Sequence, residues 1–194
     1  MTSTTKPILA APGAGLPLPE LLIARLLFAV KCRTKSREDF EKKFRDERAS
    51  IRSLVDACET PRRGETVLIK RLRGLEDSSR DWSVWMTLDH LRITNLAFAH
   101  FISTLSEGRS PNVVVNTANV KPDPAVTGEI ESAYEKSCDD FLATLAKVSD
   151  LKTGARQVHP WFGPLDAFQW LALASMHMGI HRSQISAIIA DLPK

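Results

Sequence analysis

Apolar residues recur with the period of an α-helix in the segment that begins near Ser36. Spacings of 4, 7, 3, 1 and 3 residues separate Phe40, Phe44, Ile51, Leu54, Val55 and Cys58, which fits 3.6 residues per turn. The Ser36 hydroxyl can accept a hydrogen bond from the amide of Asp39, as helix N-caps do. Pro61 and Gly64 then end the pattern. The segment is therefore predicted to form a long amphipathic helix.

The same period predicts three further long helices, over residues 79–107, 126–149 and 165–190. Gly108 follows the first of these, as is typical of a helix end. A shorter apolar segment predicts a fifth helix over residues 19–31. We therefore expect an all-α fold, a four-helix bundle with an extra short N-terminal helix. In such bundles, ligand sites form in the core from inward-facing side chains.

The segments between these helices differ in character. Residues 109–125 contain three prolines and form a long connection for neighbouring antiparallel helices. Such a connection can carry the chain back along a whole helix, which would make the two flanking helices parallel. The β-prone runs 66–70 and 113–115 are predicted to pair as a small ribbon. Residues 154–164 are predicted to form a loop.

The N-terminal part divides into an arm and a helix. Residues 1–18 are rich in Thr, Ala, Pro and Gly and are predicted to be a flexible arm, so residues 19–194 form one domain. The apolar run 21–30 is too short to span a bilayer and contains Arg25, so no transmembrane segment is expected. We expect this helix to pack on the domain. The alternative is a helix that lies on a membrane surface.

Composition and charge exclude few functions. The chain has 194 residues, 43% hydrophobic and 25% charged, and a net charge of +3, so no nucleic-acid partner is expected. Residues 31–52 contain nine basic and five acidic side chains. These mixed signs favour a solvated helix face over a nucleic-acid or lipid surface. Three widely spaced cysteines indicate neither a disulfide framework nor a thiolate zinc site, and they fit a cytoplasmic location.

Candidate chemistry centres on His177 and His181, which lie four residues apart in an apolar helical segment, with Gln184 further on. This spacing places both imidazoles on one helix face, where they can share a metal ion. Chance supplies such a pair fairly often, so a third ligand is needed. His90 lies on a stripe of small or hydroxyl residues that leaves room inside the bundle, namely Ser83, Thr87, Thr94 and Ala97.

Three neutral imidazoles favour zinc, nickel, copper or iron over magnesium or calcium. No carboxylate lies on either stripe, which favours thiol activation or no catalysis over hydrolysis. Thr94 and Gln184 are candidates for cofactor or substrate contacts or for supporting the ligands. Gln184 can equally bond a neighbouring helix. His159 is expected to bond backbone in its loop and His100 to be a packing or surface residue, while the four tryptophans are core residues or walls of the site.

With these residues the chain resembles the DinB/YfiT-like superfamily. The resemblance covers roughly residues 36–190. It is carried by Trp82 and Ser83 followed by His90 and Leu91, by the run from His159 to Leu165, and by His177, His181 and Gln184. It implies a bundle with an up-down-down-up chain path. It also implies a divalent metal, commonly zinc or nickel, held by His90, His177 and His181.

The resemblance also sets the expected function. Some DinB-like proteins are S-transferases or isomerases that use low-molecular-weight bacterial thiols, and many have no known activity. The first hypothesis is thus a cytoplasmic, bacterial, metal-dependent protein that acts on a small molecule or thiol conjugate, with zinc or nickel, or else iron, in its site. The second is a non-catalytic helical module without a functional metal that dimerises or binds a ligand. A homodimer is expected under either hypothesis.

Overall fold

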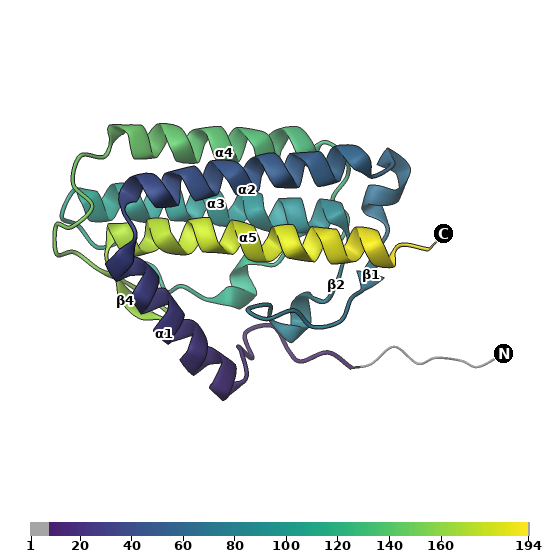
Figure 1. The fold of residues 1–194 in the computed structure, drawn as a ribbon, viewed down its shortest axis with the longest axis horizontal. Coiled ribbons are helices and arrows are strands. Elements are labelled where there is room, and N and C mark those ends of the chain that lie inside the picture. The colour runs from purple at the N-terminus through teal and green to yellow at the C-terminus, as the bar shows by residue number, and fades with distance from the viewer. Residues whose placement is uncertain (1–7, 194) are drawn as a thin grey trace.

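Helices dominate the computed structural model, which describes residues 8–193. The helices α2 to α5 lie side by side as a four-helix bundle, and α1 leaves one end of it at an angle (Figure 1). The expected all-α bundle with an extra N-terminal helix is therefore present. The helices are α1 (Leu18–Thr34), α2 (Arg37–Ala57), α3 (Val84–Ser106), α4 (Ile130–Lys147) and α5 (Ala167–Asp191).

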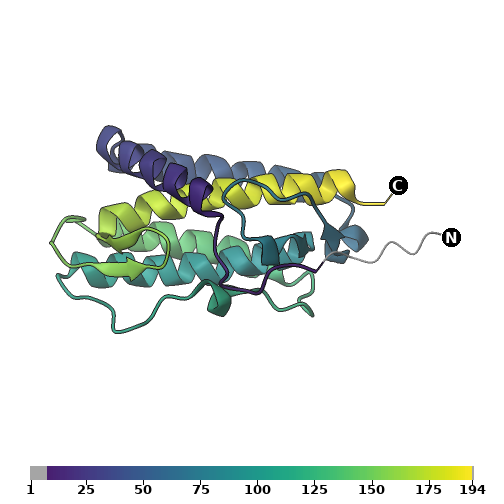
Figure 2. The same ribbon diagram turned by 90° about the horizontal axis from the view of Figure 1, so that it is seen from below.

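The bundle consists of two layers, α2 with α5 and α3 with α4, as the side view shows (Figure 2). Across the layers α3 also packs on α5, which brings the face of His90 against the last helix. The rings of Phe44 and Phe141 stack at 4.4 Å and join α2 to α4. Burial of large apolar side chains of this kind is the main stabilising contribution to such a bundle.

Side-chain caps fix where α2 and α3 begin. Ser36 Oγ accepts from the Asp39 amide at 3.2 Å, as expected, and the Asp39 carboxylate accepts in return from the Ser36 amide at 3.0 Å, which completes a capping box. Ser83 Oγ accepts from the Met86 amide at 3.1 Å, so α3 begins at Val84 rather than near residue 79. The predicted start was wrong because residues 77–82 form a 3₁₀ turn, η2 (Asp77–Ser79), and a strand before this cap.

The first strand of the predicted ribbon, within residues 66–70, pairs with a different segment than expected. Strand β1 (Val67–Leu68) pairs antiparallel with β2 (Asp81–Trp82), and not with residues 113–115. The pairing buries Val67 and Trp82 against the bundle, whereas Val114 is 91% exposed. Hydrophobic burial rather than β-propensity therefore decides which segment pairs.

A second correction concerns residues 154–164, which were predicted as a loop. They contain a hairpin of β3 (Gln157–His159) and β4 (Gly163–Leu165). Gly163 has a positive φ of 74°, which allows the chain to turn back into β4. The long connection before α4 holds the 3₁₀ turn η3 (Thr117–Val120), and α4 begins at Ile130 rather than at residue 126.

Helix α1 is attached to the domain at three points. The Phe28 ring is buried and lies 4.7 Å from that of Phe162, and Arg25 Nε donates to the carbonyl of Trp161 at 2.6 Å. At the other end Glu20 pairs with Arg71. Leucines nevertheless project into solvent along its outer side, namely Leu18, Leu22 and Leu26. No helix within residues 8–193 is long and apolar enough to cross a membrane.

The arm before α1 makes contacts of its own where it is described. The amide of Ala10 donates to Asp77 at 2.8 Å, and that of Gly15 donates to Glu76 at 3.1 Å. Residues 1–7 of the predicted arm lie outside the described residues. The division into a flexible arm and a domain that starts at residue 19 stays a prediction.

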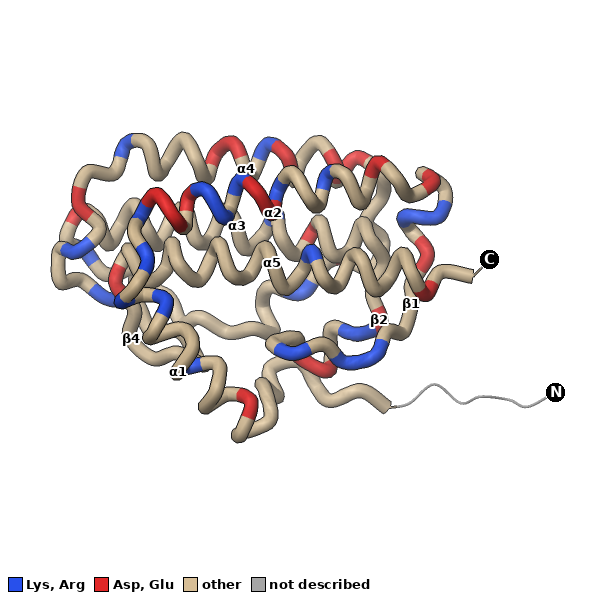
Figure 3. The backbone as a smooth tube through the Cα atoms, viewed as in Figure 1, with Lys and Arg blue, Asp and Glu red and all other residues tan. Residues whose placement is uncertain are grey.

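Acidic and basic residues are interspersed along α2 (Figure 3), and several of them form ion pairs within the helix or with neighbouring helices. Lys42 and Lys43 reach the carboxylates one turn further along α2, each at 2.6 Å. Arg48 contacts two carboxylates of α4, Glu135 and Asp139. These ion pairs lie along the bundle surface, which favours the interpretation of α2 as a helix with a solvated face.

Candidate metal centre

Three imidazoles from two helices converge in the bundle core. His90 of α3 and His181 of α5 each place Nε2 at 3.1 Å from Nε2 of His177. One ring nitrogen from each histidine lies within 4.8 Å of the other two, so the three can hold a metal ion. The structure therefore brings together the three histidines that the sequence singled out.

The bundle geometry explains this convergence. His177 and His181 lie one turn apart on α5, and the packing of α3 on α5 brings His90 beside them. The indole of Trp82 stacks on the His181 ring at 6.3 Å with an interplanar angle of 9°, and it also lies against His90 at 5.2 Å. This tryptophan precedes α3 directly, so the β1–β2 ribbon places a rigid aromatic wall behind two of the three rings.

The second ring nitrogen of His90 fixes its tautomer. Nδ1 lies 2.6 Å from the carbonyl oxygen of Val120 in η3. A carbonyl can only accept, so Nδ1 carries the proton and Nε2 presents a lone pair. Metal-binding histidines commonly use this arrangement, because the outer hydrogen bond orients the ring and raises its basicity.

His181 is oriented in the same way through Gln184. The Gln184 amide group donates to the carbonyl of Ser79 at 2.7 Å, so its oxygen faces His181. That oxygen lies 2.6 Å from Nδ1 of His181, which therefore carries the proton. Gln184 thus joins the ligand helix to η2. It orients the His181 ring and bonds a neighbouring segment, while cofactor binding by Gln184 stays a prediction.

The donor set fits a divalent metal ion. Two of the three converging nitrogens present lone pairs, and a neutral His177 has one proton with which to bridge them. Its Nδ1 has no hydrogen-bond partner within residues 8–193. Bonds of about 2.0–2.1 Å from zinc to imidazole give a separation of roughly 3.3 Å between nitrogens in a tetrahedral site. The two separations of 3.1 Å are close to this value.

The electrostatic environment keeps the three rings neutral. Burial lowers the pKa of His90 to about 4, against the opposing hydrogen bond to Val120 and with a smaller contribution from the nearby Lys121 charge. Burial and the neighbouring imidazoles hold the pKa values of His177 and His181 well below the usual range. At neutral pH a metal ion would therefore not compete with a second proton on any of these imidazoles.

A cavity of about 540 Å³ adjoins the three histidines. Thr94 and Ala97 of the predicted small-residue stripe line it. Ser83 caps α3 instead, and Thr87 Oγ1 donates to the Ser83 carbonyl at 2.9 Å. Thr94 Oγ1 donates to the carbonyl of His90 at 2.9 Å, so its hydroxyl proton is used in a hydrogen bond within α3. A contact from Thr94 to a cofactor or substrate stays a prediction.

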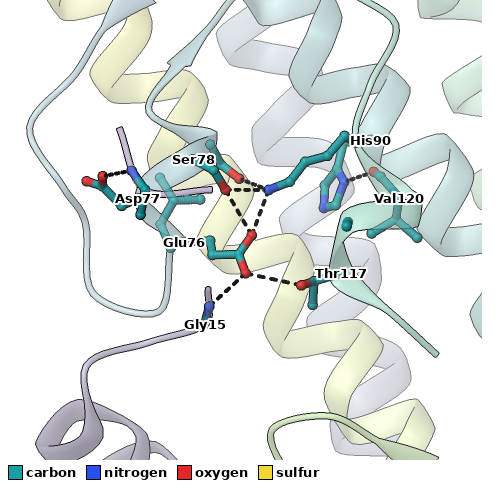
Figure 4. A network of polar contacts seen from close by, with 12 residues as sticks. Gly15, Glu76, Asp77, Ser78, His90, Thr117 and Val120 are labelled. Carbon is teal, nitrogen blue, oxygen red and sulfur yellow. Dashed lines mark hydrogen bonds and ion pairs between the residues drawn. The ribbon is translucent and has the colours of Figure 1, made fainter. Parts of the chain in front are cut away.

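Sequence reasoning missed a buried carboxylate in the cavity wall. Glu76 is 5% exposed and accepts hydrogen bonds from Gly15, Ser78, Thr117 and Lys121 (Figure 4). Burial raises its pKa, but the hydrogen bond and charge of Lys121 outweigh this effect and leave the pKa below its usual value. Glu76 lies in a turn outside both helical stripes, so helical periodicity offered no signal for it.

The remaining histidines and tryptophans lie largely as expected. His159 Nδ1 accepts from the amide of Trp161 at 3.0 Å, and burial lowers the His159 pKa to about 4. His100 is exposed on α3. Trp161 and Trp170 line the cavity, while Trp85 donates to Glu131 at 2.7 Å away from it.

Comparisons with known proteins support the fold. The chain is similar to TT2238, a four-helix bundle protein of known crystal structure, with a TM-score of 0.58 and 17% sequence identity. The similarity covers 78% of this chain and 99% of TT2238, and at this identity it shows a shared bundle fold. No protein-family model and no curated protein matches the chain.

Proposed function

We propose that this protein is a DinB-like, metal-dependent protein that acts on a small molecule or thiol conjugate. His90, His177 and His181 would hold one divalent ion, zinc or nickel before iron. The convergence of three Nε2 atoms, two of them held at 3.1 Å from the third, carries the proposal. The long segment between α3 and α4 supports the up-down-down-up chain path of that superfamily.

The chain's own residues prepare the site for this role. Val120 and Gln184 hold the protons on Nδ1 of His90 and His181, so the ligand atoms face inward. Trp82 and the bundle core exclude water from one side, and the cavity admits a ligand from the other. The chemistry that a divalent ion supplies there is Lewis acidity, which favours a thiolate over a thiol.

The carboxylates of the cavity favour thiol chemistry over hydrolysis. A general base for water needs a carboxylate or imidazole with a free lone pair within hydrogen-bond reach. Glu20 and Glu76 are the carboxylates among the described residues that line the cavity, and both are in ion pairs, with Arg71 and Lys121. The finding of Glu76 therefore leaves the preference for thiol activation unchanged. The three free cysteines support a reducing, cytoplasmic location.

Metal content tests the proposal first. Protein purified without a His tag should contain about one divalent ion per chain by elemental analysis. Single replacement of His90, His177 or His181 by Ala should each abolish binding, while His100→Ala, an exposed histidine on the same helix as His90, should leave it unchanged. Metal-free protein whose stability does not respond to zinc or nickel would refute the site.

Thiol chemistry is tested on the loaded protein. Low-molecular-weight thiols should bind with an affinity that depends on the metal, and assays with electrophilic acceptors should detect S-transfer. Metal-dependent thiol binding without transfer to any acceptor would instead favour the non-catalytic module.

A second candidate function is that of a helical module that dimerises through α1. The observation that favours it is the row of exposed leucines, Leu18, Leu22 and Leu26, which are 55–67% exposed. Light scattering should then give the mass of two chains, and the double change Leu22→Ser with Leu26→Ser should give that of one. A monomeric wild-type protein would exclude this candidate.

A further inference from the structure

The cavity beside the three histidines has a composition that selects its ligand. Its volume of about 540 Å³ is in the range of sites that enclose small molecules. Aromatic side chains from α3, α5 and the β3–β4 hairpin form much of its wall, namely Phe98, Phe101, Trp161, Phe162 and Trp170. These rings are packed against one another, with Phe101 and Trp170 at 4.9 Å and Phe98 and Trp170 at 5.7 Å. Such a wall favours ligands that bury apolar surface against it.

Among the charged side chains that line the cavity, Lys31 and Arg73 are exposed to solvent, whereas the less exposed ones are already engaged. Lys121 Nζ donates to Glu76 at 2.7 Å and also to the hydroxyls of Ser78 and Ser79 at 2.9 Å (Figure 4). Glu20 is in an ion pair with Arg71 and accepts from the amide of Gly74 at 2.6 Å. A strongly polar ligand body would lose its hydration there without gaining equivalent partners.

The three imidazoles form the one strongly coordinating end of this cavity. His177 lies edge-on to the Phe98 ring at 5.5 Å, so the metal-binding end continues directly into the aromatic wall. Ile23, Ala24 and Leu27 of α1 also line the cavity, and because Ile23 and Leu27 are more than half exposed, α1 is a partial, open cover. The anchors of α1 described above, Arg25 to Trp161 and Phe28 to Phe162, hold this cover in place.

From this arrangement we infer that the ligand is an amphiphile with one metal-coordinating head and an apolar body, which lies between α1 and the aromatic wall. The inference rests on the proposed metal site and names the class of molecule that this site receives. An aliphatic or aromatic body of about drug-like size suits the cavity.

Binding of alkyl hydroxamic acids to the zinc-loaded protein tests the inference by calorimetry. The head chelates zinc, and the chain can be lengthened from acetohydroxamic to octanohydroxamic acid. Affinity should rise roughly fourfold for each buried methylene. Octanamide, which lacks the chelating head, should bind at least about tenfold more weakly than octanohydroxamic acid. Affinity that does not change with chain length, or equal binding of amide and hydroxamate, would overturn the inference.

Two neighbouring substitutions localise the effect. Ala97→Phe adds a ring inside the cavity and should weaken octanohydroxamic acid at least about tenfold, with acetohydroxamic acid and zinc affinity unchanged. Leu96→Phe adds a similar ring at an exposed position of the same helix and should change neither. Equal losses from the two variants would contradict the assigned location.

The same measurements separate this inference from the proposed function. Protein that binds zinc but shows no dependence on chain length retains the metal site and refutes the apolar ligand class. Protein that takes up no metal refutes the metal site and the coordinating head. In that case octanamide that binds more tightly than acetamide would still support an apolar occupant.

Discussion

Nδ1 of His181 lies 2.6 Å from the side-chain oxygen of Gln184, three residues further along α5. Because the Gln184 amide group also donates to the carbonyl of Ser79, the glutamine cannot turn its nitrogen toward the imidazole without losing that bond. The pair therefore holds His181 in the tautomer whose Nε2 faces His90 and His177.

The substitution Gln184→Leu should lower metal affinity about 10- to 100-fold, the usual effect of removing a group that supports a metal ligand. Gln184→Glu keeps an acceptor for Nδ1 and should restore most of the affinity, although loss of the donor to Ser79 lowers stability. Competition with a zinc-chelating dye on folded protein measures both variants. Equal affinities of Gln184→Leu and wild type would show that Gln184 has only a packing role.

A second prediction concerns the ion pair of Glu76 and Lys121. Glu76→Gln leaves the ammonium of Lys121 without its counter-ion in a largely buried position. Breaking such a pair should cost about 3 kcal/mol of unfolding free energy, at the lower end of the usual range because Lys121 keeps some access to water. Chemical denaturation at pH 7 measures the loss.

The pH dependence of this loss follows from the lowered pKa of Glu76. The carboxylate contributes its full stability above the pKa of the unfolded chain and loses it as the pH falls through the lower folded pKa. The difference between wild type and Glu76→Gln should therefore shrink as the pH falls below about 4. The change Lys121→Met provides the matched partner for a double-mutant cycle. A constant difference between pH 7 and pH 3 would contradict the assignment.

Sequence periodicity predicted the bundle because its helices are long and their apolar faces repeat regularly. The Ser36 cap of α2 was also readable, since capping depends on local residue types. The His90, His177 and His181 cluster was within reach for a similar reason. Once two helices are expected to share a core, their inward positions can be paired, and α3 does pack on α5.

Contacts made by the loops with distant segments were not predicted. The partner of β1 is Trp82 and its neighbour, chosen by burial against the bundle rather than by β-propensity. Glu76 becomes important because Lys121, 45 residues later, folds over it. Such pairings depend on the path that the loops take across the helices, and a local sequence pattern does not predict that path.

His159 gives a third prediction, on acid sensitivity. Its pKa is lowered by burial to about 4, so the folded protein binds a proton less readily than the unfolded chain. The associated stability is complete above about pH 6.5 and is lost progressively between 6.5 and 4. We expect a loss of about 2 kcal/mol over this interval, after allowing for the partial exposure of the ring.

The variant His159→Asn isolates this titration. The asparagine oxygen can take the place of Nδ1 and accept from the amide of Trp161, while the ionisable group is removed. Unfolding free energies of the variant should vary less between pH 6.5 and 4 than those of wild type. Parallel curves for the two proteins would assign the acid sensitivity to other groups.

The last prediction concerns the contribution of His177 to the unfolding free energy of the protein without and with zinc. In the metal-free protein its Nδ1 has no hydrogen-bond partner among residues 8–193, and its one proton serves two neighbouring lone pairs. His177→Leu should therefore change the stability of metal-free protein by less than about 1 kcal/mol. By contrast, Met178→Ala, at the next and fully buried position, should cost about 2–5 kcal/mol.

Zinc at about 100 times its dissociation constant should stabilise wild type by about 2.7 kcal/mol, or roughly 5–10 °C in Tm. The same zinc should leave His177→Leu unchanged, because two imidazoles remain. A large loss in the metal-free variant would mean that His177 is a structural core residue, whereas a retained zinc response would exclude it as a ligand.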